Sequence, residues 1–180
     1  MTALRDVFIT GVGSFLPGAP IGVEAMEDHI GRINGRSSVL GKRALRWNGV
    51  KHRHYAMTPD GGVLHTNADM CARAVRAALD HSGDEVGGLG FLAAATTQGD
   101  YLAPGHATAV QGALAGPPME IASFQSVCGA SMMAAKAAWQ AVRGGEHDLA
   151  VACAGEFSSR WFRPSFYEGT ALCDAQGRLC

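Results

Sequence analysis

Three short apolar runs, separated by stretches of helical character, constrain the fold of this chain most strongly. LGFLAAATT (89–97), MEIASF (119–124) and DLAVACAG (148–155) each have the length and composition of a buried strand. The segments between them, 105–116 and 129–143, are expected to be helices. Strands that alternate with helices of about 10–15 residues indicate a parallel sheet covered by helices. The sequence therefore predicts an α/β fold.

The rest of the chain adds weaker elements. Thr66, with an acid three residues later, makes a capping-box pattern, and the amphipathic helix that it starts is expected to stop at Gly83. VFITGVGS (7–14) is predicted to be a buried strand, and GVEAMEDHIGRI (22–33) a short helix. After Phe157 the periodicity fades, and the last twenty or so residues are expected to be loop.

Composition excludes several classes of protein. The chain has 180 residues, 47% of them hydrophobic and 17% charged, which suits one globular domain with a real core. A formal net charge of −1 argues against nucleic acid as a partner. Five scattered cysteines form no disulfide framework and favour a reducing compartment. There is no apolar run of about 18 residues and no signal-peptide core, so a soluble, cytoplasmic protein that does not enter a membrane is expected.

Cys128 lies where a strand-like run gives way to a helix-like one, in SFQSVCGASMM. Free cysteine is often a small buried hydrophobe, so packing alone could explain it. The following helix has Lys136 and Arg143 as its only charges, which predicts burial on nearly all sides. The N-terminus of such a helix points free N–H groups at the sulfur and stabilises a thiolate. From the residues alone, packing and catalysis both stay open.

Six stretches together resemble a known family. They are, in chain order, GVGSFLP, NGVKHRHY, the helix 67–82, AAATTQGDYLAP, SVCGASMMAA and DLAVACAGEFSSR. In this order and at this spacing, the chain resembles the N-terminal half of a β-ketoacyl-acyl carrier protein synthase III-like enzyme of the thiolase superfamily. The resemblance covers nearly the whole chain. It implies a thiolase-like fold, in which residues 1–180 form the N-terminal half of a five-layer α-β-α-β-α sandwich with a mixed sheet and a buried central helix.

The resemblance also implies a reaction. Cys128 would be the nucleophile that accepts an acyl group from a thioester, in a ping-pong scheme. A malonyl group on a carrier protein would then decarboxylate, and the carbanion would attack the acyl-cysteine in a Claisen condensation, as in fatty acid or polyketide biosynthesis. The backbone N–H of Cys128 would form one arm of the oxyanion hole.

The family's decarboxylating His and Asn lie in its second half, which this chain does not contain. The chain would then hold the nucleophile without these partners, and full activity would require the second half. Two alternatives stay open. One is an acyltransferase or thioesterase on the same scaffold, and the other is a non-catalytic, synthase-like subunit that supports a catalytic partner.

In the family, the residue before the proline of the TT-x(6)-P stretch reaches across a dimer and limits the acyl channel of the other subunit. Ala103 occupies that position here, so the resemblance implies a homodimer and room for a longer or bulkier acyl group. Tyr101 or Leu102 could instead fill the same space. The expected partners are acyl-CoA or an acyl carrier protein. No cofactor is expected, because acyl-CoA or phosphopantetheine-linked acyl groups act as substrates.

Recognition of coenzyme A departs from the family pattern. His29 stands where the family has an adenine-stacking Trp, and an apparent insertion, RSSVLGKRALRW, follows it. Arg160 matches a family arginine beside the adenine site, although an exposed loop arginine would look the same. The stretch 29–59 holds seven Lys and Arg residues and no acid. Such a cluster is either a solvated face or a site for phosphates or for an acidic carrier-protein helix.

No metal site is expected. His52 and His54 would share one face of a strand, but no further ligands stand at zinc-like spacing. Packing explains the four remaining cysteines, which form no C-x-x-C motif: Cys71, Cys153, Cys173 and Cys180.

Overall fold

The computed structural model describes residues 4–168. The chain divides into two compact units, each built from two separate segments. Residues 4–15 and 66–156 form the first unit, and residues 16–65 and 157–168 belong to the second. The two units are described separately below.

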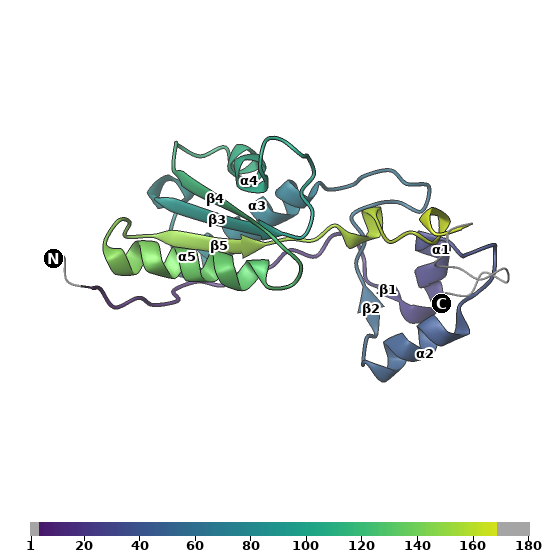
Figure 1. The fold of residues 1–180 in the computed structure, drawn as a ribbon. Helices are drawn as coiled ribbons and strands as arrows, with labels where there is room; N and C mark the ends of the chain where they lie inside the picture. The colour runs from purple at the N-terminus through teal and green to yellow at the C-terminus, as the bar shows by residue number, and fades with distance from the viewer. Residues whose placement is uncertain (1–3, 169–180) are drawn as a thin grey trace. The chain divides into compact units, whose positions relative to one another are not determined.

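A three-stranded parallel sheet forms the centre of the first unit (Figure 1). Its strands are β3 (Phe91–Thr96), β4 (Glu120–Gln125) and β5 (Ala150–Ala154), in the order β4-β3-β5. The three strand predictions from the sequence are therefore confirmed to within one or two residues at each end. β3 lies between two partners and all six of its residues are buried, which is why its sequence is continuously apolar.

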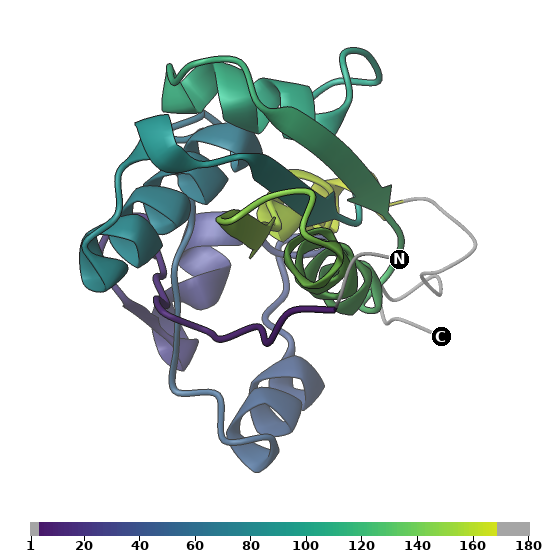
Figure 2. The same ribbon diagram turned by 90° about the vertical axis from the view of Figure 1, so that its left-hand side faces the viewer.

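Helices cover both faces of this sheet (Figures 1 and 2). The helices α3 (Asn67–Ser82) and α4 (His106–Leu114) pack on one face, where Leu92 and Ala94 of β3 point. The helix α5 (Ala130–Gly144) packs on the other face against Phe91, Ala93 and Ala95. Alternate residues of a strand point to opposite sides, so β3 contributes to both cores.

The ends of α3 follow from local sequence chemistry. The Thr66 hydroxyl accepts a 3.1 Å hydrogen bond from the Asp69 N–H, as the capping pattern predicts. Asp100 adds a second cap, accepting from the N–H groups of Asn67 (2.9 Å) and Ala68 (2.8 Å). Gly83 ends the helix with a left-handed backbone, φ +78°.

The predicted strand 7–14 is wrong. The segment belongs to no strand among the described residues, and Phe8 and Ile9 are 78% and 90% exposed. Gly11 and Gly13 press against the backbone of α3, where a Cβ would lie 2.2 and 2.3 Å from backbone atoms of Ala78. The apolar run thus follows the surface of α3 and pairs with no described strand.

The second unit holds short elements. A two-stranded antiparallel sheet pairs β1 (Ile21–Gly22) with β2 (His52–Arg53), and a 3-10 turn, η1 (Val23–Ala25), follows β1. The predicted helix 22–33 is shorter than expected, because α1 covers only Met26–Ile30. Gly31, with φ +96°, ends it.

The apparent insertion forms a helix, α2 (Val39–Trp47). The Ser38 side chain caps it, accepting a 3.0 Å hydrogen bond from the N–H of Gly41. After Phe157 the described chain has only the 3-10 turns η3 (Ser158–Arg160) and η4 (Pro164–Phe166). This agrees with the predicted loss of periodicity; the part of that prediction beyond residue 168 lies outside the described residues. None of the described helices is both long and apolar enough to cross a membrane.

Candidate active site

Cys128 occupies the tight connection between β4 and α5. Its backbone has φ +48°, a left-handed conformation that costs energy for any residue with a Cβ. The N–H of Gly129 donates to the carbonyl of Val127, which closes the turn around the cysteine. Strained backbones of this kind cluster at functional sites, so the turn is an observation that favours a role for Cys128 beyond packing.

The helix that follows begins at Ala130, with Gly129 as its N-cap. Cys128 therefore stands two residues before the helix rather than in its first turn. No side chain of the described chain caps this N-terminus, so its first N–H groups stay available to an anion. The Cys128 side chain is exposed, which rules out a buried packing role within the described residues.

α5 is not buried on all sides, contrary to the sequence prediction. Only one face is buried, through Ala130, Ala134, Ala138 and Ala141. The opposite side leaves apolar side chains in solvent: Met132 is 72% exposed, Met133 52% and Trp139 44%. The small residues explain how closely the helix approaches the sheet, and the described chain has nothing that covers its outer face.

The strand ends around Cys128 are tied together by residues that the sequence analysis missed. The carboxyl ends of parallel strands meet at one edge, so Thr97 after β3, Ser126 after β4 and Glu156 after β5 are neighbours. The Thr97 N–H donates a 2.6 Å hydrogen bond to Glu156. The Ser126 N–H donates to the carbonyl of Thr96 (3.3 Å). The sequence signal was available, because Thr97 ends one apolar run, Glu156 directly follows another, and Ser126 comes two residues after the third.

Ala103 lies in the connection between β3 and α4, and its peptide bond to Pro104 is cis. Ala103, Tyr101 and Leu102 are all exposed, the last two by 62% and 103%. The connection therefore presents a small side chain at the position for which the acyl-channel role was expected.

No protein-family model matches the chain. Among curated proteins, the β-ketoacyl-[acyl-carrier-protein] synthase III of Cereibacter sphaeroides is 28% identical over 156 residues, which are 84% of this chain and 43% of the relative. The enzyme of the same name from Bordetella petrii is 28% identical over 159 residues, 88% of this chain and 46% of the relative. The resemblance to the β-ketoacyl synthase III family is confirmed.

Solved structures agree with that resemblance. The match to the tetronic acid condensing enzyme AbyA1 has a TM-score of 0.73 at 25% identity. It spans 85% of this chain and 46% of the AbyA1 chain. The match to the β-ketoacyl synthase III of Thermus thermophilus has a TM-score of 0.68 at 18% identity, and it spans 92% of this chain and 46% of the Thermus chain. The thiolase-like α/β fold is thereby confirmed. The chain spans less than half the length of the curated relatives that it matches.

The second unit of this synthase III-like chain holds the two residues for which an adenine-site role was expected. His29, in α1, stacks on Tyr55 with ring centroids 4.5 Å apart, and its Nε2 lies 2.7 Å from the Met57 carbonyl oxygen. One face of the imidazole is thus already used inside the unit. The Arg160 guanidinium lies over the ring of Trp161, 5.2 Å from its centroid.

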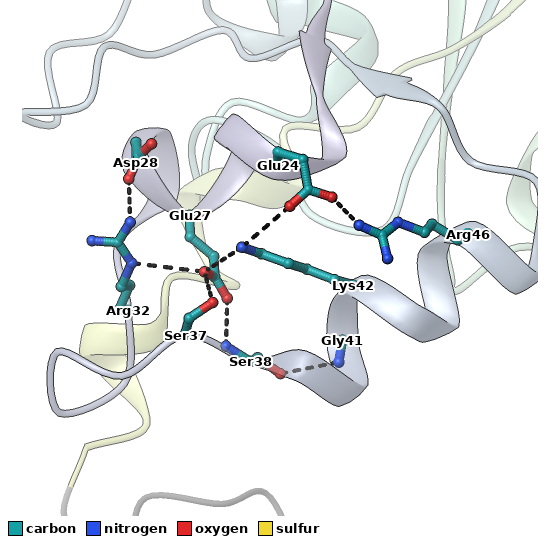
Figure 3. Close-up of polar contacts among 9 residues, drawn as sticks. All are labelled: Glu24, Glu27, Asp28, Arg32, Ser37, Ser38, Gly41, Lys42 and Arg46. Atoms are coloured by element: carbon teal, nitrogen blue, oxygen red, sulfur yellow. Dashed lines mark hydrogen bonds and ion pairs between the residues drawn. The ribbon is translucent and has the colours of Figure 1, made fainter.

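Acids from the preceding turn and helix neutralise part of the basic stretch 29–59 (Figure 3). Lys42 lies 3.2 Å from Glu27 and 3.7 Å from Glu24, and Arg46 also pairs with Glu24. Arg32 pairs with Asp28 and Glu27. Lys42 and Arg46 thus hold α2 against η1 and α1, and Arg32 pairs with acids of α1, so these three cations are already engaged rather than standing ready for phosphates. The sequence analysis missed this because the acids lie just outside the stretch that it counted.

Glu27 is the centre of this cluster, which we call the Glu27 cluster (Glu24, Glu27, Asp28, Arg32, Ser37, Ser38, Lys42 and Arg46; Figure 3). Its carboxylate accepts hydrogen bonds from the Ser37 hydroxyl (2.5 Å) and the Ser38 N–H (2.6 Å). Burial works to raise the pKa of Glu27, but the bonds from Ser37, Ser38 and Lys42 outweigh it and hold the pKa below its ordinary value.

The described residues contain no group of three or more His, Cys, Asp or Glu side chains arranged to hold a metal ion. His54 contacts the Gly18 carbonyl oxygen through Nδ1 (3.1 Å) instead. Cys71 is buried and Cys153 half-buried in the first unit, while Cys173 and Cys180 lie outside the described residues.

Proposed function

We propose that this chain is the nucleophile-bearing part of an acyl-thioester condensing enzyme of the β-ketoacyl synthase III type. The observation that carries the proposal is the strained, exposed Cys128 at the open N-terminus of α5. The curated relatives and their printed names support the same reaction class.

The first half-reaction transfers an acyl group to the protein. The Cys128 thiolate attacks the carbonyl carbon of an acyl thioester, and the thiol of coenzyme A or phosphopantetheine leaves. The positive end of the α5 dipole favours the attacking thiolate. The backbone N–H of Cys128 donates to the oxyanion that develops on the carbonyl.

The second half-reaction forms a carbon–carbon bond. A malonyl thioester loses carbon dioxide, and the resulting carbanion attacks the acyl-cysteine carbonyl and releases Cys128. The residues that promote decarboxylation belong to polypeptide outside these 180 residues, so the complete activity requires it. The reaction needs no cofactor beyond its thioester substrates, which the enzyme takes from acyl-CoA or an acyl carrier protein.

The resemblance to the synthase III family supports further proposals about the complete enzyme. The complete enzyme acts in the cytoplasm as a homodimer, with Ala103 near the acyl channel of the other subunit. Arg160 lies beside the adenine site, whereas His29, already stacked on Tyr55, contributes less to it than a free aromatic ring would. Sedimentation of the complete enzyme at micromolar concentration tests the dimer, and a monomer there removes the shared channel.

Acyl transfer from acetyl-CoA and octanoyl-CoA tests the proposed function. We expect the intact mass of the protein to rise by one acyl unit and peptide mapping to place that unit on Cys128. Cys128→Ser should lose the adduct with its fold intact, while Cys153→Ser, which changes another incompletely buried thiol, should keep it. Addition of a malonyl carrier protein should then yield a 3-oxoacyl product.

Each other outcome points to a different function. An adduct on Cys128 without any carbon–carbon bond would favour the acyltransferase or thioesterase alternative. An acyl group on another cysteine, or on none with any thioester, would overturn the catalytic role. The non-catalytic subunit would then be the better account.

A further inference from the structure

Two cysteines far apart in the sequence meet inside the first unit. Cys71 of α3 is 1% exposed, and Cys153 of β5 is half-buried on the sheet face that α3 and α4 cover. The two thiols interact with each other. This interaction, together with burial, raises the pKa of Cys71, so Cys71 keeps its proton.

An imidazole completes the cluster. Nε2 of His106, the first residue of α4, lies 3.6 Å from the Cys71 sulfur. His106 is 6% exposed, and its Nδ1 has no hydrogen-bond partner among the described residues. A buried polar atom without a partner is rare in a structural role. The histidine is therefore placed to exchange a proton with Cys71.

The backbone of β5 approaches α3 closely beside these two cysteines. At Gly155, two residues after Cys153, a Cβ would lie 2.4 Å from the Cys71 sulfur and 2.5 Å from Oδ1 of Asn67. Glycine alone permits this approach. Asn67 holds it, because its amide donates to the Gly155 carbonyl (3.1 Å) and to the Thr96 hydroxyl (2.9 Å).

We propose that Cys71 and Cys153 form a redox modification site, in which a hydroperoxide converts the two thiols into a disulfide between α3 and β5. The site is separate from the proposed acyl transfer at Cys128 and does not depend on it. The oxidant is a hydroperoxide that reaches the half-buried Cys153 thiol. Thiol reductants convert the resulting disulfide back into two thiols.

The chemistry takes two steps. Cys153, the more exposed thiol, attacks the peroxide, so that its S–H becomes S–OH and the hydroperoxide leaves as an alcohol or as water. The Cys71 sulfur then attacks the Cys153 sulfur, and the S–O bond breaks. His106 Nε2, in the tautomer with its proton on Nδ1, takes the Cys71 proton and passes it to the leaving hydroxide, which departs as water.

Peroxide titration of the purified chain tests the proposal. The starting variant carries Cys128→Ser, Cys173→Ser and Cys180→Ser, so that only the proposed pair reacts. After stoichiometric hydrogen peroxide, we expect a mass loss of two hydrogens and a non-reducing digest in which the Cys71 and Cys153 peptides are linked. Dithiothreitol should restore the original mass.

Two further variants separate the steps. With Cys71→Ser, Cys153 should stop at the sulfenic acid and be trapped by dimedone. With His106→Gln, the same adduct should accumulate and disulfide formation should slow at least about tenfold, with a thermal midpoint close to the parent. The proposal is overturned if Cys153 of the parent forms a sulfenic acid but no disulfide with Cys71. It is equally overturned if peroxide leaves both thiols unmodified.

Discussion

The backbone N–H of Thr97 donates a 2.6 Å hydrogen bond to the Glu156 carboxylate, and this bond joins the chain that leaves β3 to the chain that leaves β5. The Thr97 hydroxyl in turn lies 3.5 Å from the carbonyl of Ser126, to which it donates. Ser126 is two residues before Cys128. A carboxylate on one strand end thus helps to position the connection that carries the candidate nucleophile.

Replacing Glu156 with Ala should weaken that edge. The bond involves a charged acceptor but is exposed, so we expect a loss of about 1 kcal/mol in the free energy of unfolding. The midpoint of a urea titration measures it. Glu146→Ala removes another exposed acid, at the far end of α5, and should change the midpoint little. Equal effects of the two substitutions would show that the Thr97 contact contributes nothing.

Cys128 should react with iodoacetamide well before Cys71 at neutral pH. Cys128 is exposed in its turn, whereas Cys71 is buried and its pKa is raised by its interaction with Cys153 and by burial. Timed alkylation followed by peptide mapping gives the order. Urea should abolish the difference, since both cysteines are then equally exposed. Faster labelling of Cys71 in the folded protein would contradict the described core.

Gly155→Ala should destabilise the first unit by about 2 kcal/mol or more, because its methyl group would overlap the Cys71 sulfur and the Asn67 amide. Gly112→Ala is the matched control. Gly112 lies in α4 with nothing within 4 Å of its Cβ position, so alanine there should stabilise the helix by about 0.5–1 kcal/mol. We expect the two substitutions to shift the denaturation midpoint in opposite directions. An unchanged midpoint in Gly155→Ala would contradict the close approach of β5 to α3.

The Glu27 cluster predicts a pH dependence. The pKa of Glu27 is lower in the folded state than its ordinary value, so its contribution to stability is present above that ordinary value and is lost as the pH falls through the folded pKa. Stability of the parent should therefore fall more between pH 6 and pH 3 than that of Glu27→Gln. Urea midpoints across that range measure the difference. Glu24→Gln, which alters a more exposed member, should keep most of the parental slope.

Ala103→Phe should reduce transfer from octanoyl-CoA more than transfer from acetyl-CoA. An added ring near the proposed acyl channel takes space that only the longer chain needs. The ratio of kcat/KM for the two substrates, measured with the complete enzyme, reports the effect. Leu102→Phe places a ring on the neighbouring, fully exposed residue and should leave the ratio unchanged. Equal losses for both substrates would argue against the channel.

Much of the first unit was predictable because its signals are local. The runs that become β3, β4 and β5 lie between turn residues and are apolar over a strand's length, and Thr66 and Gly83 mark the ends of α3 within a few residues. The position of Cys128 between strand and helix follows from the same patterns. The left-handed backbone at Cys128 has no such signal, because nothing in SVCGA requires it.

The sequence by itself determined which segments become the sheet and its helices, and it placed a thiol at their junction. Contacts between distant residues decided the rest. The apolar run 7–14 has the composition of a strand, yet it pairs with no described strand and follows α3 instead. The sequence alone suggests that Lys42 is a free cation, but in the structure its amino group lies 3.2 Å from the Glu27 carboxylate. Cys71 and Cys153 are 82 positions apart in the chain, and only the packing of α3 on β5 makes them neighbours. Local patterns report each segment's own preferences, whereas pairing, burial and ion pairing depend on what the fold places opposite it.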